Sequence, residues 1–307
     1  MKRLHVIVPL AALLAGIIAA PVDAKTVSYP LENACPVVAN RPDHDPSTRE
    51  QIAHTPQGDI AYYLAKHHEV IVFDNRGVGR SLPTASSFTA QDMASDLSAL
   101  IDTLKLRDVT VLGWSMGGAV ATQLAIDHPA NAQRVVLMSA PAPGHLGAPV
   151  APDVEATLSG KPGTTFNDVM KVLFPPSAAN AAGECFRKNM FVPAGYASPT
   201  ISATVTAGQT ALLRAWEQDD AAAGALRTLH TDTLILTGDD DTILSKQNAE
   251  ALARTLPDAQ LLVVRSAGHA MMYQYPHALA TAINRFVTQS HAHPRQTANA
   301  AQLHQQA

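Results

Sequence analysis

The sequence predicts an α/β fold, in which helices flank a mostly parallel sheet. Short runs rich in β-branched residues recur along the chain, and stretches with helical periodicity lie between them. The chain has 307 residues, of which 47% are hydrophobic and 16% charged. This composition is typical of one globular domain with enough apolar side chains to bury such a sheet.

Five buried strands are expected because these runs are apolar, short and β-branched. They are residues 69–74, 109–112, 134–138, 233–236 and 261–264.

Three helices follow from apolar spacing and from start and stop signals. One stripe joins Met93, Leu97, Leu100, Ile101 and Leu104. A second helix can begin after Ser245 as its N-cap and end before Pro257, and a last one follows Pro276.

The alternation of strands and helices stops between residues 140 and 229, where Pro, Gly and short helical pieces are scattered. We interpret this segment as a helical lid inserted into one domain that spans residues 25–289. Residues 290–307 are polar without an apolar face, which predicts a disordered tail. Metal binding by His291, His293 and His304 is the less favoured interpretation of that tail.

The first 24 residues have the pattern of a secretory signal peptide. Lys2 and Arg3 precede an apolar run over residues 6–20, and the small residue Ala24 ends the segment. A run of 15 residues is shorter than the roughly 20 that a membrane-spanning helix needs. We therefore expect an exported protein, periplasmic or secreted, that begins at Lys25 and has no stable membrane anchor.

The charge of the chain argues against binding to nucleic acid. The formal net charge is −4, and no basic stripe interleaved with aromatic residues is present to attract a phosphate backbone. Cys35 and Cys185 are the only cysteines, and the sequence leaves open whether they form a disulfide.

A serine lies between glycines at residues 113–117, Gly-Trp-Ser-Met-Gly, directly after a predicted strand and before a helical run. A strand-to-helix turn this tight presents the serine hydroxyl above the sheet and leaves no room for side chains two positions away. Ser115 is therefore the candidate nucleophile. The start of the helix favours the negative charge of a tetrahedral intermediate, and the Met116 N–H is a candidate oxyanion donor.

A serine hydroxyl needs a base within reach and an acid that orients the base. His269 follows the predicted strand at 261–264, where a loop returns to the carboxyl edge of the sheet. Asp239, Asp240 and Asp241 follow the strand at 233–236, and chemistry alone leaves the choice among them open.

These motifs, together with Asp-Asn-Arg-Gly-Val-Gly-Arg-Ser at residues 74–81, resemble the α/β-hydrolase superfamily over residues 54–287. The sequence is most similar to the small esterases, lactonases and cofactor-free haloperoxidase-like members. The resemblance implies an α/β-hydrolase fold and selects Asp241 as the acid, because the family places it three residues after the glycine of this turn. It also implies that the turn at 74–81 is structural.

One part of the family pattern has no counterpart here. Residues 55–63 resemble an early hairpin of the family, yet they run directly into the expected strand at 69–74. The strand, oxyanion loop and helix that the family places between them have no equivalent between Tyr63 and Leu64. The sequence thus predicts the loss of a central strand and of one oxyanion donor, which typically lowers the rate about 10²–10³-fold.

Two functions remain open at this point. The first is a serine hydrolase, carboxylesterase-like, that acts on a small carboxylic ester, thioester or lactone with Ser115, His269 and Asp241 and needs no metal or organic cofactor. The second is a weakened or inactive relative that binds such molecules without cleaving them.

Overall fold

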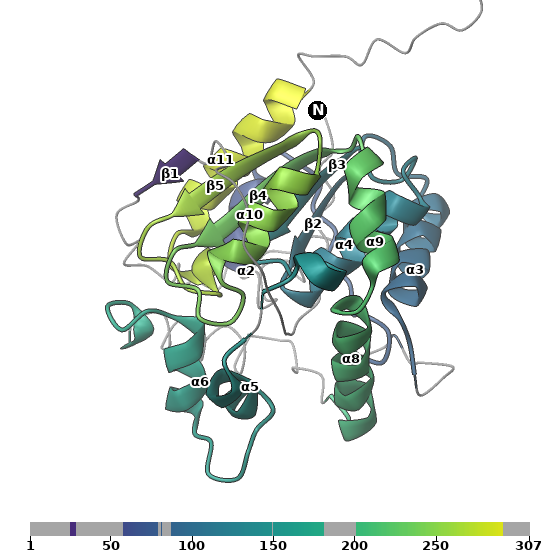
Figure 1. Ribbon diagram of the computed structural model, residues 1–307. Helices are drawn as coiled ribbons and strands as arrows, with labels where there is room; N and C mark the ends of the chain where they lie inside the picture. The colour runs from purple at the N-terminus through teal and green to yellow at the C-terminus, as the bar shows by residue number, and fades with distance from the viewer. Residues whose placement is uncertain are drawn as a thin grey trace, which may run out of the picture.

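The computed structural model describes residues 25–28, 58–78, 81, 87–148, 150–180 and 201–290. A five-stranded sheet lies at its centre with the order β1-β5-β4-β3-β2, and each neighbouring pair is parallel (Figure 1). The strands are β1 (Lys25–Val27), β2 (Thr110–Trp114), β3 (Arg134–Met138), β4 (Asp232–Gly238) and β5 (Ala259–Val264). The predicted α/β class is confirmed.

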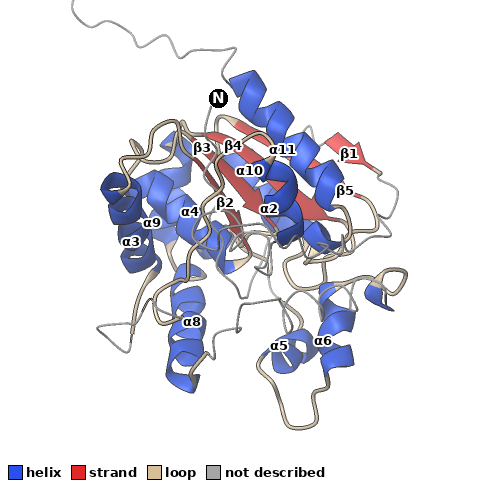
Figure 2. Ribbon diagram, turned by 180° about the vertical axis from the view of Figure 1, so that it is seen from behind, coloured by secondary structure: helices blue, strands red, loops and turns tan. Residues whose placement is uncertain are grey.

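Helices cover both faces of the sheet (Figure 2). One apolar cluster joins the sheet to α3 (Ala90–Thr103), α4 (Met116–Asp127) and α10 (Lys246–Thr255). A second cluster joins the other face to α2 (Gly58–Ala65) and α11 (Pro276–Ser290). Side chains alternate between the clusters, because successive residues of a strand point to opposite faces.

Four of the five predicted strands are confirmed, and so are the three predicted helices as α3, α10 and α11. Ser245 is the N-cap residue of α10, although its side chain makes no cap hydrogen bond. The apolar stripe of α3 is correct for Met93, Leu97 and Ile101, which are buried, but Leu104 lies beyond the last turn and is 47% exposed.

The predicted strand at residues 69–74 is wrong, since the segment is not part of any strand. Val70 and Val72 pack on one apolar cluster and Phe73 on the other, as in an extended chain. A segment rich in β-branched residues becomes a strand only when an adjacent strand supplies partners for its backbone hydrogen bonds. In the described part of the chain the sheet ends at β2, and no strand lies between β2 and this segment.

The predicted early hairpin at residues 55–63 is also wrong where the structure describes it. Residues 58–65 form α2 instead. Ile60, Ala61 and Leu64 lie on one buried face of this helix, which contacts α11. This spacing of i, i+1 and i+4 is helical, so the apolar pattern favours the observed element.

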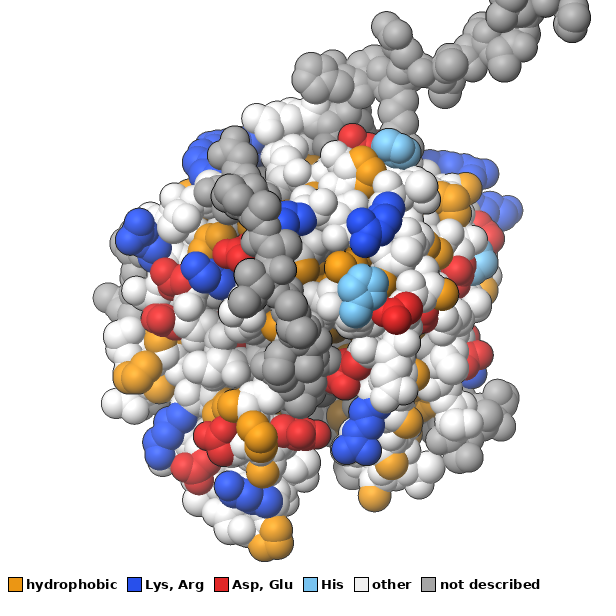
Figure 3. Space-filling view, viewed as in Figure 1, with side chains coloured by type: hydrophobic (Ala, Val, Ile, Leu, Met, Phe, Trp, Pro, Cys, Tyr) orange, Lys and Arg blue, Asp and Glu red, His pale blue; other side chains and the backbone are white. Residues whose placement is uncertain are grey.

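The segment between β3 and β4 holds helices and no strand in its described part. They are η1 (Gly144–Leu146), α5 (Pro152–Leu158), α6 (Phe166–Leu173), α8 (Ala203–Trp216), α9 (Asp220–Ala225) and η2 (Leu226–Thr228). α5 and α6 project as one lobe and α8 as another, and the outline of the molecule is notched between the two (Figures 1 and 3). We call these the α5–α6 lobe and the α8 lobe.

Several sequence predictions lie outside the described residues. These are the signal peptide at residues 1–24, both cysteines, and the tail beyond α11. Among the residues that are described, no helix combines the length and the apolar character needed to cross a membrane.

Candidate active site

Ser115 sits at the sharp turn between β2 and α4. Its backbone has φ 54° and ψ −126°, which lies outside the regions that a side chain normally tolerates. A Cβ on Gly113 would lie 2.1 Å from the carbonyl oxygen of Gly117, and one on Gly118 would lie 2.3 Å from the Ala140 Cβ. The turn closes only because glycines occupy these positions, and it holds Ser115 in a strained conformation of the kind found at functional sites.

His269 is the partner of this serine. The loop after β5 brings its Nε2 to 2.9 Å from the Ser115 Oγ. The indole Nε1 of Trp114, the last residue of β2, donates to the His269 carbonyl oxygen at 2.8 Å. The residue beside Ser115 therefore also fixes the backbone of His269.

Asp241 is the aspartate that reaches His269. Its Oδ2 and Oδ1 lie 3.0 and 3.2 Å from the imidazole Nδ1. Its Oδ1 also accepts the backbone N–H groups of Ile243 and Leu244, both at 2.9 Å. These two bonds leave the carboxylate one orientation, in which it can hold the imidazole.

The two neighbouring aspartates have other roles. Asp239 accepts the backbone N–H of Ser266 at 2.7 Å, and the Asp240 N–H donates to the Ala267 carbonyl oxygen. Both side chains are exposed. The structure thus brings Ser115, His269 and Asp241 together and keeps the other two carboxylates apart from them.

The three joined side chains are shielded from water. Ser115 is 0% exposed, His269 3% and Asp241 6%. In a site of low dielectric constant, hydrogen bonds and charges act more strongly than they do in water. A chain of hydrogen bonds from a carboxylate through an imidazole to a hydroxyl can remove the hydroxyl proton when that oxygen attacks a carbonyl carbon.

Met116 is the first residue of α4, so its N–H has no acceptor within the helix. The N–H of Ser115 itself donates to the Met138 carbonyl oxygen at 3.0 Å and is occupied. Met116 therefore stands where the sequence placed a candidate oxyanion donor. On the far side of β2, the described residues include no strand whose loop could supply a second donor.

A family model for the alpha/beta hydrolase fold matches residues 51–276. The chain belongs to this family. The resemblance inferred from the motifs is thereby confirmed, and the protein is a hydrolase of the α/β fold.

Named relatives span several activities. This hydrolase is 29% identical over 233 residues to a poly(3-hydroxyalkanoate) depolymerase of Ectopseudomonas oleovorans, with 74% of this chain and 79% of that protein covered. It is 27% identical over 242 residues to a putative non-heme bromoperoxidase, BpoC, of Mycobacterium tuberculosis, with 74% and 86% covered. A match to polyketide synthase ThaQ of Burkholderia thailandensis, 28% identical, covers 76% of this chain but only 11% of that protein.

A solved structure supports the fold independently. A thermophilic esterase from Thermogutta terrifontis aligns with a TM-score of 0.63 over 95% of this chain and 91% of that one, at 22% identity. At that identity the likeness concerns the arrangement of the chain alone.

Two features beside the candidate site were missed by sequence reasoning. Ser139 follows β3, has a left-handed φ of 44°, and is buried with no partner for its hydroxyl among the described residues. The Gln274 side chain bonds to the loop that carries His269. Neither residue belongs to a motif, because each is defined by contacts that only the folded chain creates.

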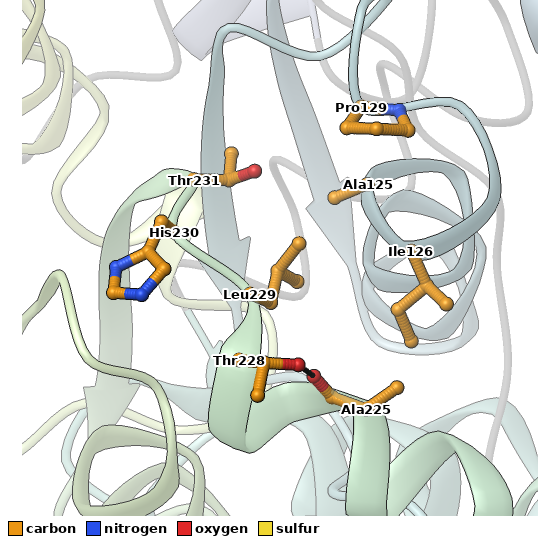
Figure 4. A pocket seen from close by; sticks show the side chains of 8 residues that line it. All are labelled: Ala125, Ile126, Pro129, Ala225, Thr228, Leu229, His230 and Thr231. Atoms are coloured by element: carbon orange, nitrogen blue, oxygen red, sulfur yellow. Dashed lines mark hydrogen bonds between the residues drawn. The ribbon is translucent and has the colours of Figure 1, made fainter. Parts of the chain in front are cut away.

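A separate cavity of about 310 Å³ lies away from the triad (Figure 4). Its walls come from the far end of α4 and from the loop between η2 and β4, and they include Ile126, Leu229 and His230. Ser115 adjoins the opposite end of α4, about 15 Å away at 1.5 Å per residue. The cavity is therefore not part of this site.

Proposed function

We propose that this hydrolase is a carboxylesterase-like serine hydrolase that cleaves a small carboxylic ester, thioester or lactone through an acyl-enzyme. One observation carries the proposal, namely the unbroken hydrogen-bond chain from Asp241 through His269 to Ser115. The name of the relative from Ectopseudomonas oleovorans, a depolymerase of a polyester, is in line with ester chemistry.

The mechanism follows from this geometry. The Ser115 Oγ attacks the carbonyl carbon while the His269 Nε2 takes its proton, and Asp241 holds the imidazolium that forms. The Met116 N–H and the start of α4 stabilise the oxyanion. His269 then gives the proton to the leaving alcohol or thiol. Water, deprotonated by the same imidazole, releases the acid from Ser115.

A second candidate function rests on the position of β2 at the edge of the sheet, where no neighbouring strand is described that could supply a second oxyanion donor. In this alternative the protein binds ester-like molecules but turns them over slowly or not at all. With one oxyanion donor instead of two, the rate would be lower by about 10²–10³-fold. The two candidates differ in turnover and in the reactivity of Ser115.

A fluorophosphonate probe separates them, because it bonds covalently to an activated serine. We expect the purified protein to be labelled, Ser115→Ala to be unlabelled, and Ser245→Ala, at the partly exposed N-cap of α10, to label normally. A p-nitrophenyl ester series of increasing chain length then measures turnover. A folded protein that the probe leaves unmodified would favour the binding protein, whereas labelling without turnover would indicate the weakened enzyme.

We also propose that the protein is exported. The pattern of its first 24 residues supports this, and cleavage after Ala24 would leave Lys25, the first residue of β1, at the new N-terminus. N-terminal sequencing of the protein from a periplasmic extract should begin Lys-Thr-Val. Recovery of the uncleaved chain from the cytoplasmic fraction alone would contradict export.

A further inference from the structure

We propose that Gln274 is a positioning residue whose carboxamide fixes the loop that carries His269 and so aims the imidazole at Ser115. Its Oε1 accepts the backbone N–H of Gly268 at 2.8 Å, and its Nε2 donates to the carbonyl oxygen of Ser266 at 2.9 Å. The side chain is 1% exposed. The inference rests on the role of His269 in the proposed function.

The loop draws on side chains because the Gly268 N–H and the Ser266 carbonyl oxygen make no backbone hydrogen bond among the described residues. The Tyr275 hydroxyl also donates to the Ser266 carbonyl oxygen, at 3.2 Å, but of these two side chains only Gln274 reaches the Gly268 N–H. Ser266 has a left-handed φ of 54°, so the chain turns sharply before the base. Gly268 is buried, and a buried N–H without a partner destabilises a fold by about 1–3 kcal/mol. Glutamine carries a donor and an acceptor on one planar group, which lets a single side chain satisfy both backbone groups.

Gln274 is itself held rigidly. It follows the short helix η3 (Met271–Tyr273), and its own N–H donates to the Met271 carbonyl oxygen at 3.0 Å. After His269 the backbone forms η3, and the Gln274 side chain at the end of η3 bonds to Ser266 and Gly268, just before His269. The base lies inside this closed ring of hydrogen bonds.

Other contacts hold the same loop, so loss of Gln274 should tilt the base rather than unfold the domain. Asp239 accepts the Ser266 N–H, Trp114 donates to the His269 carbonyl oxygen, and the Ala270 N–H donates to the Leu173 carbonyl oxygen. A displacement of about 1 Å between reacting groups lowers the rate about 10²-fold.

The first test compares Gln274→Met, which has a similar length but neither polar group, with Gln247→Met, an exposed glutamine of α10. We expect kcat for a p-nitrophenyl ester to fall about 10²-fold in Gln274→Met while KM changes less than about threefold. Gln247→Met should match the unsubstituted protein. Equal kcat values for all three proteins would overturn the inference.

The second test uses Gln274→Glu as a switchable replacement. A protonated carboxyl has one donor and one acceptor and can make both bonds, whereas an ionised carboxylate only accepts and faces the Ser266 carbonyl oxygen. Burial raises the pKa of a glutamate carboxyl above its ordinary value. The kcat ratio of Gln274→Glu to the unsubstituted protein should fall as pH rises, a trend that a purely structural role would not give and that Gln274→Met should not share. A pH-independent ratio would overturn the inference even if Gln274→Met does not fold.

A third measurement separates this inference from the proposed function. In a Ser115→Ala background, which needs no activity, the proton shared by the His269 Nδ1 and Asp241 gives a downfield NMR signal. We expect Gln274→Met to shift or broaden this signal and Gln247→Met to leave it unchanged. An unlabelled unsubstituted protein would defeat the proposed function, while an unmoved signal would defeat the positioning role.

Discussion

The two sides of Ser115 are built in different ways. On the acid–base side, the loops after β4 and β5 are joined by hydrogen bonds from the Asp239 N–H to the Val264 carbonyl oxygen and from the Asp240 N–H to the Ala267 carbonyl oxygen. A Cβ on Gly238 would lie 2.0 Å from the Ala267 carbonyl oxygen, so the loops also pack without space between them. On the other side, β2 is the edge strand of the sheet in the described part of the chain, paired with β3 alone, and the segment at 69–75 does not join the sheet.

The difference separates proton transfer from charge stabilisation. The acid–base side holds the two side chains that would move a proton to and from Ser115 in the proposed mechanism, and further hydrogen bonds fix Asp241 and the loop of His269. The opposite side is where the family resemblance places a second oxyanion donor. In the proposed mechanism, nucleophile activation and oxyanion binding thus depend on different parts of the chain, and substitutions can test each part separately.

The largest effect is expected at the acid. Asp241→Asn keeps the shape of the side chain but removes the charge that faces the imidazole, and it favours the wrong tautomer of the base. We expect kcat for a p-nitrophenyl ester to fall about 10⁴-fold. Asp240→Asn is the matched control and should stay within about twofold, since its exposed carboxylate makes no contact with His269. Equal losses at the two positions would mean that the assigned acid is wrong.

The next effect concerns the turn that joins the two sides. Gly113→Ala would place a methyl group 2.1 Å from the Gly117 carbonyl oxygen, a backbone atom that cannot move away alone. We expect a loss of about 3 kcal/mol or more in the free energy of unfolding, measured by urea denaturation, together with loss of probe labelling. Gly224→Ala in α9 meets no atom within 4 Å and should be neutral or slightly stabilising. A stable Gly113→Ala protein that still labels would show that the turn is more open than described.

A smaller effect should appear in hydrogen exchange. Backbone amides of β4 are bonded between β3 and β5, whereas residues 70–73 lie outside every strand. We expect amides at 70–73 to exchange at least about 10²-fold faster than those at 234–237, because local opening needs less free energy there. Mass spectrometry of peptic peptides measures this ratio. Similar protection of the two segments would indicate that 69–75 is paired and that the two sides are alike.

These contrasts also explain what the sequence could predict. The runs that form β2 to β5 and the Gly-Trp-Ser-Met-Gly turn are local patterns, and their geometry follows from neighbouring residues. The choice of Asp241 came from family resemblance, since the three aspartates look alike until the Ile243 and Leu244 amides orient one of them.

The errors arose where structure depends on distant partners. Residues 69–74 carry a strand-like pattern, but a strand also needs a neighbour that no local pattern reveals. The contacts of Gln274 with the His269 loop span six and eight residues of irregular chain and have no periodicity to detect. The helix α2 was different, because Ile60, Ala61 and Leu64 carried a helical signal that the hairpin interpretation overrode.

The α5–α6 lobe and the α8 lobe each contact one of the two sides of Ser115, and the lobes also contact each other. The α5–α6 lobe is bonded to the acid–base side, where Thr242 donates to the Val172 carbonyl oxygen and Ala270 to that of Leu173. The α8 lobe packs on the other side, against Phe88 and the first turns of α3 and α4. Arg214 of α8 lies 3.8 Å from Glu155 of α5 and bridges the lobes.

The smallest predicted effect tests this bridge. Desolvation by burial and, to a smaller extent, the nearby Glu155 raise the pKa of Glu217 to about 7, while Arg214 opposes the rise. Glu217 therefore keeps its proton in the folded protein up to a higher pH than in the unfolded chain, where it is released near the ordinary pKa of 4.5. The free energy of unfolding should consequently fall as pH rises from about 4.5 to about 7 and then level off. Because Glu217 is only half-buried, we expect the loss to be about 1 kcal/mol or less.

Glu217→Gln should remove this pH dependence and raise the melting temperature at pH 8 by up to about 4 °C. Glu155→Gln should recover part of the gain by removing the second cause of the shift, while giving up the contact with Arg214. Thermal denaturation of the three proteins at pH 4.5 and pH 8 decides the matter. If Glu217→Gln loses stability between the two values as the unsubstituted protein does, Glu217 is not the group that titrates. If Glu155→Gln leaves the pH dependence unchanged, the lobes do not bring these carboxylates together, and the two sides of the site meet only through the sheet.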